Sequence, residues 1–409
     1  MNAVQFKKIK TTLDFVLKSK ISDFYRKKYS DEKLRLNSPQ DFLNIPFLTR
    51  DEIAKSPPTA RLFVPQEEVK TWITTSGTTS KEPLIIPASP LKQDYLQVLA
   101  QNLKKYSVKR IMLLKPSGYA NLRILDWNSH PKLSGYPLIF GDLRQLETTA
   151  SLAKLLKIDA LETTPTALHF FIPYLKEIYP LSNIKYIILG GEYTSDQKYK
   201  FFKTYLKNAY FDFTFGGTET RGKKGLRCDY LNRTREPRFF HPISNLFHFE
   251  VTGEGELILT TLFKTPFPLI RYKTGDMVSI TKNSCPCGRK EQMEVFGRVG
   301  YDSVRIGGIT VHRHLVEVAL PKFNGDWEMH LFEEVNNKRL MPKLVLHLSK
   351  TSKKEAALIA ERVQRNLKVG PNLYLKKLVD DEIFLPLKIE LVNSFEEKYK
   401  RAKLVSHIK

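Results

Sequence analysis

The stretch Thr75-Ser76-Gly77-Thr78-Thr79-Ser80-Lys81-Glu82-Pro83 stands between two short apolar runs, Val69 to Ile73 and Leu84 to Pro87, which both read as strands. Glycine permits a sharp backbone turn, and hydroxyls with exposed backbone N–H groups hydrogen-bond phosphate oxygens. Lys81 adds a positive charge. The Walker pattern is absent, because a second glycine and a Lys-Ser/Thr pair are missing. Taken alone, such a cluster is more often an ordinary loop than a phosphate-binding one. Other parts of the chain are needed to choose between the two.

The bulk composition is that of a globular protein with more than one domain. The chain has 409 residues, of which 42% are hydrophobic and 27% charged. It contains no apolar run of about 18 residues, so no transmembrane segment is expected. The first 20 residues lack an apolar signal core, and a cytoplasmic location is therefore predicted.

The net charge of +23 is compatible with a polyanionic partner. The lysines and arginines, however, are spread along the whole chain, and no zinc-finger spacing or RNA-recognition signature occurs. A diffusely basic composition is favoured over a nucleic-acid footprint, so no specific nucleic-acid partner is expected.

The first 300 residues predict a layered α/β architecture. Apolar spacings of three and four predict a helix over residues 1 to 35. Strands and helices then alternate, which is typical of a layered sheet. The predicted strands are 108–114, 160–164, 184–189 and 209–215, and the predicted helices are 146–156, 167–178 and 195–208. In such sheets, binding residues lie just past the carboxyl ends of the strands. Two clusters stand there, Gly190-Gly191-Glu192 and Gly216-Gly217-Thr218-Glu219.

Downstream, the pattern changes twice. Short strands are predicted at 246–251, 255–262 and 278–281, with a charged loop over 270–276. The last part carries its own helix at 353–367 and strands at 343–348 and 389–392. We therefore predict a large α/β domain with a β-rich subdomain over residues 1–299, and a small α+β domain over residues 300–409.

Several clusters fall in one order along nearly the whole chain. The order resembles that of the adenylate-forming superfamily of acyl-CoA synthetases, and most of all its phenylacetate–coenzyme A ligase branch. The segments that carry the resemblance are 24–26, 45–50, 75–79, 190–192, 215–219, 260–262, 268–276, 285–289 and 297–298. The resemblance makes the stretch at 75–83 a phosphate loop, although Ser80 replaces the more usual glycine and Glu82 is an added acid. It also implies that the small C-terminal domain is a mobile lid.

The resemblance implies a two-step reaction. A carboxylate attacks the α-phosphate of ATP and gives an acyl-adenylate, and a thiol then displaces AMP. The thiol is that of coenzyme A or of a carrier-protein phosphopantetheine, and the acid is expected to be aromatic or hydrophobic. An amine or hydroxyl acceptor, in a secondary-metabolite or cell-surface pathway, and a non-catalytic nucleotide-binding relative remain as alternatives, and a homodimer is left open.

The resemblance also implies roles for individual residues, which suit their chemistry. Oxygen ligands suit Mg²⁺, a carboxylate can accept bonds from both ribose hydroxyls, and an aromatic ring can stack on a base. The implied roles are phosphate binding by Thr75, Ser76, Gly77, Thr78, Thr79 and Lys81; α-phosphate binding by Thr218; Mg²⁺ binding by Glu219; adenine contact by Gly190, Gly191, Glu192, Phe215 and Gly216; and ribose or phosphate contact by Asp276 and Arg298.

The adenylation lysine is expected near the end of the chain. Lys398 fits best, because Tyr-Lys-Arg follows it, and Lys400 is the next choice. The glycine that normally precedes this lysine is missing, and a solvated basic tail is the alternative.

Cys228, Cys285 and Cys287 are the only cysteines of the chain. In a cytosolic protein, the Cys-Pro-Cys spacing favours a metal over a disulfide. Tetrahedral zinc needs a fourth ligand. By resemblance to zinc-binding members of the branch this is His241, with His248 as the competitor. A structural zinc is predicted; three reduced thiols and a surface histidine are the alternative.

Overall fold

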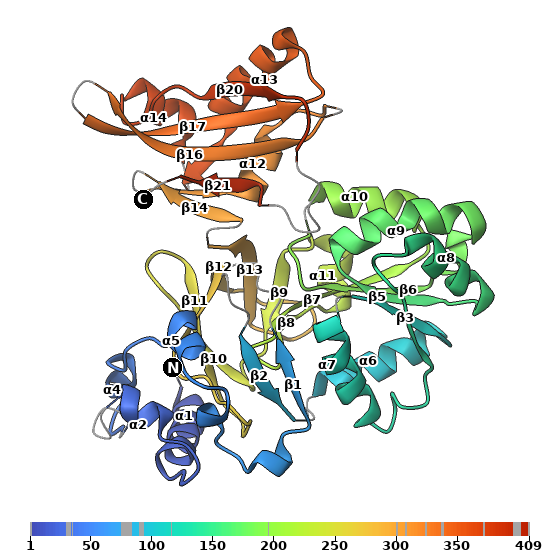
Figure 1. Cartoon of the computed structure of the whole chain (residues 1–409). Helices are drawn as coiled ribbons and strands as arrows, with labels where there is room; N and C mark the ends of the chain where they lie inside the picture. The colour runs from blue at the N-terminus through green and yellow to red at the C-terminus, as the bar shows by residue number, and fades with distance from the viewer. Residues whose placement is uncertain are drawn as a thin grey trace. The chain divides into compact units, whose positions relative to one another are not determined.

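The computed structural model in Figure 1 divides into two compact units. The first comprises Met1–Thr274 with Ser279–Glu294, and the second comprises Gly275–Val278 with Val295–Lys409. The structure describes residues 2–29, 34, 36–74, 84–89, 94–115, 117–194, 196–299, 302–306, 309–323, 325–336, 339–370, 373–395 and 402–407. The boundary between residues 299 and 300 stays a prediction.

An 11-stranded sheet in the order β10-β11-β12-β13-β9-β8-β7-β6-β5-β3-β4 organises the large unit. Its parallel part consists of β3 (Ile111–Leu114), β4 (Leu138–Phe140), β5 (Ala160–Thr163), β6 (Tyr186–Gly190) and β7 (Tyr210–Gly217). Its helices are α6 (Asp94–Lys105), α7 (Ser117–Asn128), α8 (Leu146–Leu155), α9 (Pro165–Ile178), η3 (Leu181–Asn183) and α10 (Asp196–Tyr205). Figure 1 shows helices on both faces of these strands, as expected of buried parallel strands. The predicted α/β class is confirmed.

Antiparallel pairing continues the sheet beyond β7. These elements are β8 (Gly222–Leu226), α11 (Asp229–Thr234), β9 (Phe239–Pro242), β10 (Phe247–Val251), β11 (Glu256–Thr261), β12 (Tyr272–Lys282) and β13 (Glu291–Arg298). The expected loop over 270–276 is wrong from Tyr272 onward, because these residues belong to β12. Tyr272, Thr274 and Asp276 are buried and alternate with less buried residues, as in a strand. Polarity alone does not show this alternation, so the segment was expected to be a loop.

The single N-terminal helix predicted over residues 1 to 35 is wrong. The chain forms α1 (Ala3–Leu17), α2 (Phe24–Lys28), α4 (Pro39–Leu43), α5 (Arg50–Lys55), η1 (Thr59–Arg61) and η2 (Gln66–Glu68). Between α1 and α2, the Ser19 hydroxyl accepts from the N–H groups of Ile21 and Ser22. Local hydroxyl bonds of this kind compete with helix hydrogen bonds, and they explain the break.

Strands β1 (Thr71–Thr74) and β2 (Ile85–Ala88) form an antiparallel pair in which Thr74 lies opposite Ile85. The expected phosphate loop joins their ends. Its residues 75–83 lie outside the described part of the chain.

The small unit has a four-stranded sheet in the order β20-β17-β16-β21, and helices pack on its inner face. Its elements are β14 (Ser303–Ile306), β15 (Ile309–His312), α12 (Arg313–Ala319), β16 (Trp327–Asn336), β17 (Arg339–Ser349), α13 (Lys353–Asn366), β18 (Lys368–Gly370), β19 (Leu373–Tyr374), α14 (Leu375–Asp380), β20 (Lys388–Val392) and β21 (Leu404–Ser406). Among the described residues, no helix is long and apolar enough to cross a membrane.

Candidate functional site

The carboxyl ends of β6 and β7 lie side by side and carry two of the predicted clusters. Gly190 at the end of β6 stands opposite Thr214 of β7. A Cβ atom on Gly190 would lie 2.0 Å from the Thr214 hydroxyl, so a side chain cannot fit. Gly191 follows with a φ of +86°, which disfavours other residues. This edge is where α/β sheets bind ligands.

Glu192 is oriented toward the start of α9. Its carboxylate accepts a hydrogen bond from the Thr166 N–H at 3.1 Å. The Thr164 hydroxyl caps the same helix by accepting from the Ala167 N–H. An acid at a helix N-terminus is favoured by the helix dipole. The strand end, its glycines and α9 thus form one connected edge.

The turn between β7 and β8 carries Thr218 and Glu219. Gly217 and Gly222 pair across it, and the Thr220 hydroxyl donates to the carbonyl of Gly217 at 2.9 Å. Glu219 is 8% exposed, and its carboxylate accepts from the guanidinium of Arg50 at 3.1 Å. The predicted magnesium ligand therefore has a cationic partner within the protein.

Arg50, which begins α5, was not among the predicted site residues. A capping box fixes this helix start, because the Thr49 hydroxyl and the Glu52 carboxylate each bond a backbone N–H of the other residue. Backbone bonds between Leu48 and the Arg271–Lys273 segment tie the same stretch to the sheet. Arg50 ends segment 45–50, which carries part of the resemblance. Its position in that motif could therefore have indicated a functional role.

Phe215 is half-buried at the end of β7. Its ring lies 5.6 Å from that of Phe240, and the Lys224 ammonium lies 4.3 Å from its centroid. A cation so close to an aromatic face is attractive. Gly216 is confined by the carbonyl of Gly222, 2.6 Å from where its Cβ would be.

A buried ion cluster lies at the ends of β3 and β5. Glu162 is fully buried, and one of its oxygens accepts from Lys115 at 3.1 Å and from Arg123 at 2.6 Å. Burial opposes ionisation, but the two cations outweigh it and lower the pKa of Glu162 to about 2. The carboxylate is ionised near neutral pH. This cluster was not predicted from the sequence, because its members are separated by up to 47 residues.

Asp276 and Arg298 both belong to the second compact unit. The Arg298 guanidinium donates toward the Asp276 carboxylate at 3.3 Å. Gly275 and Gly297, with φ values of +73° and +110°, stand next to them in the chain. Their predicted ribose and phosphate roles are untested.

The remaining predicted nucleotide residues lie outside the described part of the chain. They are Thr75, Ser76, Gly77, Thr78, Thr79, Lys81 and Lys398, together with the alternative Lys400.

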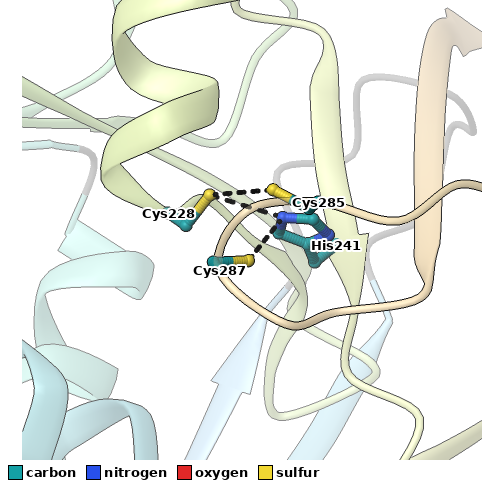
Figure 2. Close-up of side chains that lie close together, drawn as sticks. All are labelled: Cys228, His241, Cys285 and Cys287. Carbon is teal, nitrogen blue, oxygen red and sulfur yellow. Dashed lines mark hydrogen bonds between the residues drawn. The ribbon is translucent and has the colours of Figure 1, made fainter.

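The three cysteines and His241 converge in the large unit, as Figure 2 shows. Cys228 precedes α11, His241 lies on β9, and Cys285 and Cys287 occupy the turn between β12 and β13. Their four ligand atoms lie within 4.8 Å of one another. The thiols are free, with 3.7 Å between the sulfurs of Cys228 and Cys285.

The imidazole of His241 is held with one nitrogen facing the sulfurs. Its Nδ1–H donates to the carbonyl of Glu291 at 2.8 Å, which leaves the Nε2 lone pair free to bind. Nε2 lies 3.5 Å from the sulfur of Cys228 and 3.4 Å from that of Cys287. Burial is the main cause that lowers the pKa of His241, which favours the neutral ring that binds metals.

These distances fit zinc. Tetrahedral zinc places two thiolate sulfurs about 3.8 Å apart, and a sulfur and an imidazole nitrogen about 3.5 Å apart. The observed separations of 3.7, 3.5 and 3.4 Å agree. His248, the competing histidine, is not part of the cluster; its ring packs against Phe42.

No family model matches the chain. The phenylacetate–coenzyme A ligase of Thermus thermophilus is 40% identical to it over 68 residues, which are 16% of this chain and 15% of that protein. The sequence likeness to this curated relative therefore spans a small part of its length.

Solved structures match far more of the chain. 2-Hydroxyisobutyryl-CoA ligase in the postadenylation state has a TM-score of 0.72 at 16% identity, over 99% of this chain and 90% of that chain. The chain has the fold of the adenylate-forming CoA ligases. Anthranilate CoA ligase in complex with anthranoyl-AMP has a TM-score of 0.54 at 17% identity, over 83% of this chain and 66% of that one. o-Succinylbenzoate coenzyme A synthetase from Bacillus subtilis, in complex with AMP, has a TM-score of 0.53 at 15% identity, over 82% and 68%. The resemblance inferred from the sequence is confirmed at the level of the fold.

Proposed function

We propose that the protein is an AMP-forming acid–thiol ligase that activates a carboxylic acid as its acyl-adenylate and transfers the acyl group to coenzyme A. The observation that carries this proposal is the shared edge formed by Gly190–Glu192 and Phe215–Glu219 at the ends of β6 and β7. It occurs in a fold whose solved examples include CoA ligases bound to AMP or to an acyl-adenylate.

In the first step, the residues of this edge bind and orient the nucleotide. Gly190, which has no room for a side chain, and Gly191, with a φ of +86°, let the backbone approach the adenine, and the Phe215 ring stacks on it. The Thr218 hydroxyl donates to the α-phosphate. The carboxylate of the acid attacks the α-phosphorus, the bond to the β-phosphate oxygen breaks, and pyrophosphate leaves. Positioning and charge neutralisation supply most of the catalysis in such transfers.

Charge neutralisation falls to the phosphate loop, to Lys398 and to the Mg²⁺ that Glu219 would bind. Thr75 to Thr79 and Lys81 hold the outer phosphates, and Lys398 stabilises the developing charge. Glu219 offers the oxygen donors that Mg²⁺ prefers, and bound Mg²⁺ supplies positive charge to the phosphates. Because Arg50 now neutralises Glu219, we infer that the carboxylate exchanges this partner when the nucleotide binds.

In the second step, the thiolate attacks the acyl carbonyl, and AMP leaves with the electron pair of the acyl–phosphate bond. Asp276 and Arg298 are proposed to hold the ribose and phosphate through both steps. Coenzyme A is the acceptor favoured by the fold comparisons. A carrier-protein phosphopantetheine is the second choice, and the net charge of +23 suits either anionic acceptor.

The acid is proposed to be aromatic or otherwise hydrophobic. This follows the sequence resemblance to a phenylacetate–coenzyme A ligase.

A structural zinc bound by Cys228, His241, Cys285 and Cys287 completes the proposal. Four protein ligands leave no open position, so this metal stabilises the β12–β13 turn and takes no part in the reaction. A cytoplasmic location and a homodimer stay predictions.

The test is carboxylate-dependent exchange of labelled pyrophosphate into ATP, measured with a panel of aromatic, aliphatic and hydroxy acids. The proposal predicts exchange with at least one hydrophobic acid and formation of a CoA thioester with the same acid. Exchange without a thioester would favour an amine or hydroxyl acceptor. The absence of exchange with every acid would leave a nucleotide-binding relative without turnover.

A further inference from the structure

Three histidines gather on the outer face of the sheet in the small unit. His330 lies on β16, His347 on β17, and His407 directly after β21. The rings of His330 and His347 stack with centroids 3.9 Å apart, and the ring of Phe332 stacks on that of His407 at 4.3 Å. This cluster lies outside the nucleotide edge and outside the cysteine–histidine set.

His330 and His407 are joined by a direct bond between their rings. Nδ1 of His330 lies 2.9 Å from Nε2 of His407, and the ring planes differ by 15°. Nε2 of His330 lies 3.1 Å from a carboxylate oxygen of Glu328. A carboxylate accepts only, so Nε2 of His330 carries the proton. In the neutral ring Nδ1 is then an acceptor, and His407 must donate. The three residues form a chain of bonds directed from His407 to Glu328.

This chain of bonds tolerates one added proton but not two. With one imidazole protonated, an N–H···N bond still forms. With both protonated, each facing nitrogen carries a hydrogen and neither offers a lone pair, so the bond between His330 and His407 is lost. Two cationic rings would also repel each other at this distance.

Near the cluster, the described carboxylates outnumber the described lysines by one, so these side chains offset the charge of about one added proton. The described charged side chains near the cluster are Asp326, Glu328, Glu334, Lys343, Lys388, Glu390 and Lys403, and Lys403 pairs with Asp326. Lys343 pairs with Glu334, and Lys388 pairs with Glu390. Glu390 also contacts His347, the third titratable imidazole. Strand β14 packs against β16 and β21 and adds no titratable group among its described side chains.

The bond between His330 and His407 holds the end of β21, which is an edge strand of the sheet. β21 has three residues, and among the described strands it pairs only with β16. The buried side chain of Leu404 anchors its start. At its end, the His407 N–H donates to the carbonyl of Leu331 at 2.9 Å, and the His407 ring bonds His330. At the start of the strand, Lys403 bonds Asp326 and the carbonyl of Trp327, so the His407 contacts are those that hold the opposite end.

We propose that Glu328, His330 and His407 form a proton-sensitive clamp that holds the end of β21 on β16 and releases it when both imidazoles are protonated. Burial is the largest cause that lowers the pKa of His330, and His347 and His407 lower it further, against the opposing effect of Glu328. A histidine whose folded pKa is lowered contributes stability above its ordinary pKa of about 6.5, and this stability is lost as the pH falls below that value.

The clamp has a consequence for turnover that rests on the proposed function. β21 begins six residues after Lys398, the proposed adenylation lysine. Because β21 is the next described element after this lysine, its release would remove the nearest described anchor downstream of it in the chain. The adenylation step is therefore expected to weaken at acid pH, together with the protection of β21.

The clamp is tested by hydrogen exchange of the full chain at about pH 7.5 and about pH 5.5, corrected for the intrinsic pH dependence of exchange. Protection of a peptide covering residues 402–407 should fall about tenfold at the lower pH, the equivalent of one hydrogen bond. In His407→Phe, which keeps an aromatic ring against Phe332, protection should be lower and equal at both pH values.

Two controls separate the clamp from general acid sensitivity. His347→Phe keeps the stack on His330 but lies outside the chain of bonds, so the pH dependence should persist. A peptide covering α13 reports on the unit as a whole. Equal protection of the wild-type strand at both pH values, the same pH dependence in His407→Phe, or a parallel fall in α13 would each overturn the clamp. Because exchange is read without substrate, the result is independent of the proposed enzyme activity.

Discussion

The cysteine–histidine cluster and the β7–β8 turn both offer metal ligands in the large unit, but their surroundings differ. The four ligand atoms of the cluster face one another, and the far nitrogen of His241 is already bonded to a carbonyl. Glu219 instead faces the cation Arg50 across 3.1 Å. A closed ligand set is typical of a structural metal, whereas a substrate site must exchange partners. The comparison predicts that the cluster governs stability and the turn governs chemistry.

The largest effect is expected from removing a ligand of the cluster. His241→Ala should reduce zinc from about one per chain to well under one, and lower the melting temperature by roughly 10 °C, because several kcal/mol of metal-binding free energy is lost. Metal analysis and calorimetry measure the two effects. His248→Ala removes another buried ring, which lies outside the cluster, and should keep the zinc. Equal zinc content in both variants would contradict the assignment of the cluster as a structural zinc site.

Lys398→Ala should abolish carboxylate-dependent pyrophosphate release, by about 10³-fold or more, because the developing phosphate charge loses its cation. The melting temperature and the zinc content should not change. Lys400→Ala is the matched control and should retain most activity. If the two variants exchange these outcomes, Lys400 is the adenylation lysine.

Glu219→Gln should lower the rate of pyrophosphate exchange by about 10²-fold, since a neutral amide binds Mg²⁺ poorly. The variant should stay folded, because glutamine keeps the shape of the side chain and an oxygen that can accept from Arg50, while the loss of the largely buried ion pair lowers stability moderately. Exchange should recover in part at higher magnesium concentration. A large loss of stability with unchanged exchange would reverse the roles assigned to the two regions.

Phe215→Leu should give the smallest effect, a rise in the KM for ATP of about tenfold, in line with the loss of one base–aromatic stacking contact. Phe215→Tyr keeps the ring and should behave like the wild type. An unchanged KM in the leucine variant would remove Phe215 from the nucleotide site without affecting the other assignments.

The sequence predicted four of the five parallel strands, because β3, β5, β6 and β7 have buried cores that read as apolar runs, whereas the edge strand β4 is short and half-exposed and was missed. β6 and β7 fall within two residues of the predicted strands, and both clusters of glycine and acid stand at their ends. The same reasoning failed for the N-terminal helix, since apolar spacing continues across Ser19 while the serine hydroxyls bond the backbone locally.

Long-range pairs were beyond sequence reasoning. Arg50 and Glu219 are separated by 169 residues, and Glu162 meets two cations that no motif associates with it. The cysteine set was predictable from the resemblance, because Cys-Pro-Cys is a strong local signal and few residue types complete a tetrahedral zinc site.

The central claim is that the edge formed by the ends of β6 and β7 activates a carboxylic acid with ATP. The most direct measurement is carboxylate-dependent exchange of labelled pyrophosphate into ATP, by wild type and Glu219→Gln side by side. The account predicts exchange by the wild type with at least one hydrophobic acid, and a rate about 10²-fold lower in the variant. Exchange that is equal in the two proteins, or absent from the wild type with every acid, would contradict it.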